Sequence, residues 1–132
     1  MENSLESRMS LLDLRPSIPS ILEEGAISSA ERFQNSCLRP ILKWQNDLLV
    51  RAMERHIRKR KQPWAEMKRG KRQAFIQQSL RKDLRFQEFM IGLIVGYFTL
   101  EEWEVYLEEE AELRRRIISM CIQRLEDQLL GG

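Results

Sequence analysis

The residues that could perform catalysis are few and lie far apart in the chain. There is one histidine, His56, and there are two cysteines, Cys37 and Cys121. If residues 38–60 form one helix with a rise of 1.5 Å per residue, His56 lies about 27 Å from Cys37, too far for a catalytic pair within one chain. Cys121 lies among isoleucines, which is typical of a buried apolar residue rather than a nucleophile. We therefore predict no catalytic residues and no enzymatic activity.

A metal or cofactor site is equally poorly supported. Residues 99–113 contain seven glutamates and no basic residue, a net charge of −7. Helical di-iron sites use Glu-x-x-His pairs, but the residue three positions before the only histidine is a methionine. Glu110 and Glu112 each precede an arginine by four residues, Arg114 and Arg116, the favoured spacing for ion pairs. We predict a structural charge ladder here, with no bound metal or cofactor.

A block of basic residues suggests an alternative function, nucleic-acid binding. Residues 51–85 contain 13 Lys+Arg and 3 Asp+Glu, a net charge of +10 in a chain whose total is only +2. Such a block attracts phosphates, and Trp64 can stack on an unpaired base. The isoelectric point near 8.7 is nevertheless below the value above 9 that is typical of nucleic-acid domains, and Lys/Arg-rich connections between helices are common solvated surfaces. The candidate nucleic-acid contacts are Arg51, Arg55, Arg58, Lys59, Arg60, Lys61, Trp64, Lys68, Arg69, Lys71 and Arg72.

The spacing of apolar residues predicts an all-α fold. Apolar positions at helical spacing indicate helices over residues 38–60, 70–81 and 84–97, and no segment alternates as a strand does. The third is apolar almost all round in its second half, which is typical of the centre of a bundle, and Gly92 and Gly96 predict tight packing there. We expect an elongated helical bundle of about four to five helices with a long C-terminal helix.

The last helix is predicted to run from Thr99 to Gly131 without a break. Thr99 and Glu102 fit a capping box. The helix would be roughly 45 Å long, whereas a compact chain of this size is very roughly 36 Å across. The residues of its apolar stripe are Trp103, Leu107, Ala111, Ile118, Ile122, Leu125 and Leu129.

In its second half, residues on well over half of the circumference need burial, which is uncommon on a monomer. We predict a homodimer, because a two-fold pairing would cover this surface. The alternative is that residues 1–27 fold back over it. The predicted dimer face consists of Ile117, Ile118, Cys121, Ile122, Leu125 and Leu129.

The domain organisation follows from composition. Residues 1–27 are rich in Ser, Pro and acidic groups and are predicted to be a loosely ordered arm, and residues 28–132 a single helical domain. No apolar run of signal-peptide length follows the N-terminus, and the longest apolar run, residues 89–98, is well short of the roughly 20 residues that span a bilayer. We therefore expect a cytoplasmic protein with reduced cysteines and no membrane partner.

Four segments resemble a small all-α bacterial protein family of unknown function. They read FQN-x-x-LRPILKWQNDLL from Phe33, KDLRF from Lys82, GLIVGYFT-x-EEW from Gly92 and EL-x-RRI from Glu112. The resemblance covers residues 33–128, and members of that family often carry the label glyoxalase. Common glyoxalases resemble paired βαβββ modules with His and Glu metal ligands, so the residues of this chain do not support that label. The sequence favours a non-catalytic protein-interaction module that acts as a homodimer.

Overall fold

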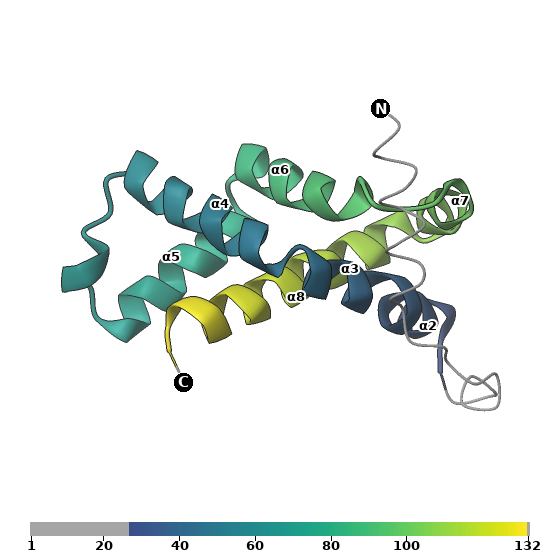
Figure 1. Cartoon of the computed structure of the whole chain (residues 1–132), viewed down its shortest axis with the longest axis horizontal. Helices are drawn as coiled ribbons and strands as arrows, with labels where there is room; N and C mark the ends of the chain where they lie inside the picture. Colours follow the sequence, from purple (N-terminus) through teal and green to yellow (C-terminus); the bar gives the residue numbers. More distant parts are fainter. Residues whose placement is uncertain (1–26, 132) are drawn as a thin grey trace.

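The computed structural model describes residues 27–131, and within that range every regular element is a helix (Figure 1). A long C-terminal helix is present, so the predicted fold class is confirmed. The predicted arm, residues 1–27, lies almost entirely outside the described residues. The elements are α2 (Ser29–Phe33), a π-helical turn (Gln34–Leu38), α3 (Arg39–Trp44), α4 (Asn46–Lys59), a 3₁₀ turn (Trp64–Glu66), α5 (Arg69–Arg81), α6 (Leu84–Val95), α7 (Leu100–Glu108) and α8 (Glu110–Leu129).

The first four helical elements follow one another without a loop and form a single bent helix. It begins at Ser28, whose Oγ accepts a hydrogen bond from the N–H of Glu31 (3.1 Å). It bends at Gln45, where φ is −91° and ψ is 5°, so the helix predicted over residues 38–60 is not straight. Counting this bent helix once, together with α5 to α8, gives five helices in the described part of the chain, within the predicted four to five.

The residue at the bend, Gln45, also contacts α6. This side chain is the one polar group on an apolar stripe, and it is buried. A buried amide needs a hydrogen-bond partner, and the Nε2 of Gln45 donates to the carbonyl of Leu93 in α6 (3.0 Å). The bend therefore joins the α3–α4 junction to the C-terminal part of α6.

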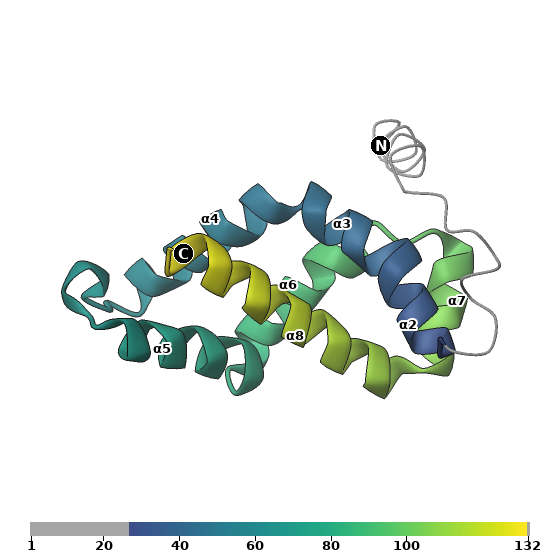
Figure 2. The same ribbon diagram turned by 90° about the horizontal axis from the view of Figure 1, so that it is seen from below.

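The centre of the bundle is α8, not α6 as predicted. Helices α4, α5 and α6 and the π-helical turn all pack against α8 (Figure 2). Leu113, Ile117 and Leu125 are completely buried there, whereas α6 leaves Leu84 and Phe89 exposed. Helix α6 is apolar almost all round its second half, but it does not lie in the centre of the bundle. Helix α8 does, because it is longer and contacts more of the other helices.

The α8 face predicted to bind a second copy is covered by the chain's own helices. Ile117, Ile118, Cys121, Ile122 and Leu125 are buried, and Leu129 is half-buried and packed on the core. The prediction that this face is exposed is therefore wrong, because α4, α5 and α6 converge on it. The homodimer stays a prediction, but it needs another surface.

The predicted single helix from Thr99 to Gly131 is broken at Glu109, where φ is −130° and ψ is 39°. Like charges four residues apart destabilise a helix, and glutamates recur at that spacing here. The break places Glu110 and Glu112 in the first turn of α8, where the helix dipole favours acidic groups. Across the fold, the Oγ of Ser29 donates to the Oε1 of Glu109 (2.8 Å), which joins the break to α2.

The break also changes which side of α7 is buried. The capping box is confirmed, since the Oγ of Thr99 accepts from the N–H of Glu102 (3.1 Å) and the Glu102 carboxylate accepts from the N–H of Thr99 (2.9 Å). Tyr106 is buried against Phe98. Three residues of the predicted buried stripe, Trp103, Leu107 and Ala111, are exposed instead. The predicted stripe is correct only from Ile118 onward, where Ile118, Ile122 and Leu125 are buried and Leu129 packs on the core.

The predicted tight packing at Gly92 and Gly96 is also wrong. Both glycines are exposed, and a Cβ atom added to Gly92 would meet nothing within 4 Å among the described residues. This side of α6 is therefore open, in contrast to the sides of α6 that pack on α5 and α8.

Candidate functional site

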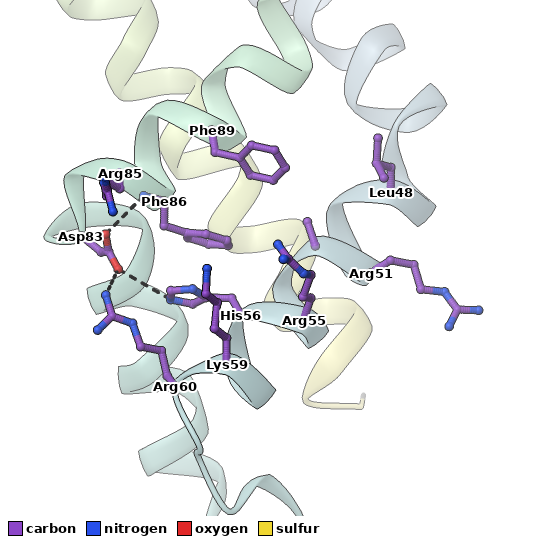
Figure 3. Close-up of a pocket in the computed structure, with 11 residues that line it drawn as sticks. Leu48, Arg51, Arg55, His56, Lys59, Arg60, Asp83, Arg85, Phe86 and Phe89 are labelled. Atoms are coloured by element: carbon purple, nitrogen blue, oxygen red, sulfur yellow. Dashed lines mark hydrogen bonds and ion pairs between the residues drawn. The ribbon is translucent and has the colours of Figure 1, made fainter.

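Helices α4 and α6 both pack on α8, and a groove of about 660 Å³ separates them (Figure 3). Two polar contacts join the helical segments that flank the groove, and of these only the second, between Arg60 and Asp83, involves residues that line it. Gln45 donates to the carbonyl of Leu93, and the Nη2 of Arg60 lies 2.6 Å from the Oδ2 of Asp83. These two contacts join the bent helix to α6 and to its N-cap residue.

The floor of the groove is apolar and partly open to solvent. Leu48 is 46% exposed and Phe89 is 51% exposed, with Ala52 and Phe86 deeper in the groove. Figure 3 shows the Phe89 ring projecting from α6 into the space toward α4. Trp44, one turn before Leu48 on the same side of the bent helix, is also 46% exposed. The described residues leave these apolar side chains without a cover.

The rim of the groove is cationic. The charged residues that line it are Arg51, Arg55, Lys59, Arg60, Arg85 and Asp83, so with His56 neutral the net charge is +4, five positive groups minus one negative. Arg60 pairs with Asp83, and the Nη1 of Arg51 lies 3.9 Å from the Oε1 of Glu54. Among the described residues, Arg55, Lys59 and Arg85 form no ion pair within 4 Å. The groove therefore combines an apolar floor with unneutralised positive charge.

Asp83 pairs with Arg60 and also caps a helix. Its Oδ1 accepts from the N–H of Phe86 (3.2 Å) and so caps α6. This backbone hydrogen bond lowers the pKa of Asp83, and the hydrogen bond from Arg60 lowers it further. The carboxylate is consequently ionised and engaged in holding the two helices.

His56 is packed rather than available for proton transfer. Its ring stacks on Phe86 with centroids 3.9 Å apart and on Phe75 with centroids 5.6 Å apart. Burial lowers the pKa of His56; nearby Asp83, at 3.8 Å from Nε2, opposes this, and the positive charges of Arg60 and Lys59 add to the lowering. Burial is the largest of these influences on the pKa of His56.

Four residues of the predicted nucleic-acid surface are used within the fold. Arg72 lies over the Trp64 ring at 5.4 Å from its centroid, and its Nε donates to the Trp64 carbonyl (2.8 Å). The Nη1 of Arg69 donates to the carbonyl of Leu130 at the end of α8 (2.8 Å), and Arg60 pairs with Asp83. Trp64 is thus covered on one side and half-buried. The other predicted contacts are exposed: Arg51, Arg55, Arg58, Lys59, Lys61, Lys68 and Lys71.

The sequence prediction found much of the rim but missed the floor. It placed Leu48 on the apolar stripe of an amphipathic helix and Phe89 in a buried helix, and it did not include Arg85, whose side chain lines the groove from α6. A signal was present, because Arg85, Phe89 and Gly92 recur at helical spacing on one side of α6. Arginine is rarely buried, so an arginine on the same side of a helix as an aromatic residue indicates that this side is exposed rather than part of the core.

The remaining chemical candidates have structural explanations. Burial raises the pKa of the Cys121 thiol to about 12, in agreement with its interpretation as a small apolar residue. The Nε of Arg116 lies 3.5 Å from the Oε1 of Glu112, as the charge ladder predicts, but Arg114 pairs with Glu88 of α6 instead of Glu110. In residues 27–131 there is no group of three His, Cys, Asp or Glu residues placed to hold a metal ion.

No helix in this described range is both long enough and apolar enough to span a membrane. The chain matches no family model, no curated protein and no solved structure. The resemblance to the glyoxalase-labelled family therefore stays a prediction.

Proposed function

We propose that this protein is a non-catalytic, cytoplasmic protein-interaction module that binds an acidic amphipathic helix in the groove between α4 and α6. One observation carries the proposal. The half-exposed apolar side chains of Leu48 and Phe89 lie between helices whose rims carry Arg55, Lys59 and Arg85. An amphipathic helix presents an apolar stripe flanked by charge, and acidic flanks match this rim.

The dimensions of the groove suit a helix as its occupant. Leu48 and Lys59 are separated by eleven residues of α4, or about 16 Å along the helix axis. That length corresponds to about three turns of a bound helix. Helix-in-groove recognition uses apolar anchors at every third or fourth residue, and the floor offers such anchors contact with Leu48, Ala52 and Phe89.

Gly92 of α6 gives further support. A glycine in an exposed helix costs about 1 kcal/mol relative to alanine, and nothing in the described residues packs against Gly92. A surface without a Cβ allows another backbone to approach closely. Gly92 continues the side of α6 that carries Phe89, so a helix lying along this side can come close to the α6 backbone.

Nucleic acid is a weaker candidate for the same surface. Phosphates would neutralise the rim but leave the apolar floor uncovered, and Trp64 already packs against Arg72 and Phe75. The cytoplasmic part of the proposal is supported by the two cysteines, which are buried and are not joined in a disulfide.

The test is a binding titration of the full-length protein with a fluorescent helical peptide. The peptide carries Leu and Trp at positions i, i+3 and i+7 with Glu at the flanking positions, and a twin peptide carries Lys in place of Glu. We expect the acidic peptide to bind, with an affinity that falls as salt increases, and the Lys peptide not to bind. Two other anionic ligands are tested in parallel, the fatty acid laurate and a single-stranded oligonucleotide. Binding of either one without binding of the acidic peptide would contradict the proposal.

Matched variants locate the binding site. Arg55→Glu combined with Arg85→Glu reverses two charges in the groove, whereas Lys68→Glu combined with Lys71→Glu reverses two exposed charges outside it. Both variants have the same net charge. We expect the groove variant to weaken acidic-peptide binding by at least about tenfold, since two charge contacts are replaced by repulsion, and the control to bind nearly as the parent does. Equal weakening by the two variants would show that net charge alone attracts the peptide.

A further inference from the structure

We infer that α7 of a second copy of this chain is a helix that the groove binds, so that the protein pairs with itself. This inference takes the proposed groove function as its basis and names the partner. It starts from an observation that is independent of the groove, namely that α7 exposes an apolar stripe although it lies in a well-packed fold.

The stripe on α7 consists of three side chains. Leu100 is 84% exposed, Leu107 is 43% exposed and Trp103 is 39% exposed. At about 100° per residue these positions lie within roughly 60° of one another around the helix. Tyr106, which anchors α7 to Phe98, lies on one side of the stripe. The side chains that face solvent on α7 are therefore unusually apolar.

The other flank of this stripe is acidic. The same angular spacing places Glu104, Glu108 and Glu101 in succession beside the stripe, and all three are exposed. Helix α7 thus has the apolar stripe and the acidic flank that the groove requires. The distance along the helix from Leu100 to Leu107 is about 10 Å, which fits within the roughly 16 Å between Leu48 and Lys59.

A chain cannot place its own α7 in its own groove, so the α7 that fills the groove must belong to another copy. Figures 1 and 2 show α7 beside α2 at one end of the elongated fold, whereas the C-terminal end of α4 and α5 lie at the other. The packing of Tyr106 on Phe98 and the Ser29–Glu109 hydrogen bond hold α7 in that position. The charge follows the same division, with a net +10 in residues 51–85 and −7 in residues 99–113.

An antiparallel pairing places the acidic end of each copy against the basic end of the other. Two-fold pairing makes each contact twice, and it is the commonest arrangement of soluble homo-oligomers. This interface differs from the α8 face predicted from the sequence, which is buried. It would cover Leu48 and Phe89 of one copy with Leu100, Trp103 and Leu107 of its partner.

The test is the mass of the full-length protein in solution, by light scattering after gel filtration at tens of micromolar protein and low salt. We expect about 32 kDa, twice the chain mass of 15.8 kDa, and a shift to the monomer as salt is raised. The α7 variant combines Glu101→Lys, Glu104→Lys and Glu108→Lys, and the groove variant combines Arg55→Glu, Lys59→Glu and Arg85→Glu. We expect each variant alone to be monomeric, because its α7 and its groove then carry charges of the same sign.

The decisive measurement is an equal mixture of the two variants. Each α7 then meets a groove of opposite charge in the other variant, so the mixture should form a heterodimer near 32 kDa. A control with Arg58→Glu, Lys68→Glu and Lys71→Glu has the same net charge as the groove variant and should remain dimeric. Circular dichroism establishes that all variants are folded.

The outcomes separate this inference from the proposed function. A monomeric parent whose groove still binds the acidic peptide overturns the inference and leaves the proposed function intact. A dimer that persists in both charge variants overturns it by placing the interface elsewhere. A dimer seen only after deletion of residues 1–26 also overturns it for the intact chain, and would identify those residues as the occupant of the groove.

Discussion

The apolar residues of α8 and those between α4 and α6 occur at the same helical spacings but differ in exposure. Ile117 and Leu125 on α8 are completely buried, whereas Leu48 and Phe89 are about half exposed. Helices α4, α5 and α6 converge on α8, while no described element covers the groove. The groove faces also carry arginines, which are rarely buried without a partner. The composition of the whole face therefore separates a core stripe from a binding stripe better than the number of its apolar residues does.

Truncating one leucine on each face should give the largest contrast. We expect Leu125→Ala to lower the free energy of unfolding by about 2–5 kcal/mol, because a fully buried leucine leaves a cavity. Leu48→Ala should cost about 1 kcal/mol or less, since its side chain is already half in solvent. Urea denaturation of both variants measures the difference. Similar losses would show that Leu48 is part of the core in solution.

The parts of this fold that were predictable from the sequence are those determined by a few neighbouring residues. Thr99 caps α7 as expected, and Ser28 and Asp83 cap α2 and α6 with the same local geometry. Each of these caps depends on one side chain and the backbone N–H three residues further along, so the pattern is visible in the sequence. The buried interpretation of Cys121 was correct for a similar reason, since its helical neighbours are isoleucines.

The errors concern properties that arise only when distant segments meet. The break at Glu109 has no glycine or proline to mark it, and its carboxylate is bound by Ser29, eighty residues away. Once the helix is broken there, the direction of the α7 stripe can no longer be extrapolated from α8. A periodic pattern predicts which residues share a face, but not which face another helix will cover.

The candidate site shows the same division. Cations of α4 were identified because they are close together in the sequence, but the groove also needs Arg85 and Phe89 from a helix that begins 25 residues after α4 ends. Their proximity depends on Gln45 and Asp83, the residues that fix α4 against α6. No local pattern contains that information.

Removing the Gln45 contact should have an intermediate effect and should act on both faces. Gln45→Leu keeps the side-chain volume but removes the donor to the Leu93 carbonyl, and loss of one partner of a buried hydrogen bond costs about 1–3 kcal/mol. Gln73→Leu, at an exposed position of α5, is the matched control and should be nearly neutral. We also expect the Gln45 variant to bind the acidic peptide more weakly, because the bent helix loses one of its contacts with α6. Unchanged stability and binding would mean that α6 is held by its contacts with α8 alone.

The smallest expected effect is on the pH dependence of stability, through His56 beside the Arg60–Asp83 ion pair. Burial lowers the pKa of His56 below its ordinary value near 6.5, so the folded state binds fewer protons than the unfolded chain as the pH falls through 6.5. The stability contributed by neutral His56 is therefore fully present above that pH and is lost below it. Urea denaturation at pH 7.5 and 5.5 should show lower stability at pH 5.5, and His56→Gln should reduce this difference.

Asp83→Asn should enlarge the difference in stability between pH 7.5 and pH 5.5. This variant tests whether burial or the charge of Asp83 has the larger effect on the pKa of His56. The carboxylate of Asp83 attracts a protonated His56 and partly opposes the effect of burial, so removing its charge should lower the pKa of His56 further. Asparagine is as good an N-cap as aspartate, so the cap of α6 is retained. The pKa of Asp83 itself is lowered from 3.8. Ionised Asp83 therefore contributes to stability above pH 3.8, and this contribution is lost only below that pH, outside the range measured. Higher stability at pH 5.5 than at pH 7.5 in the parent protein would mean that attraction to Asp83 outweighs burial in its effect on the pKa of His56. His56 would then be charged beside Asp83 in the folded protein.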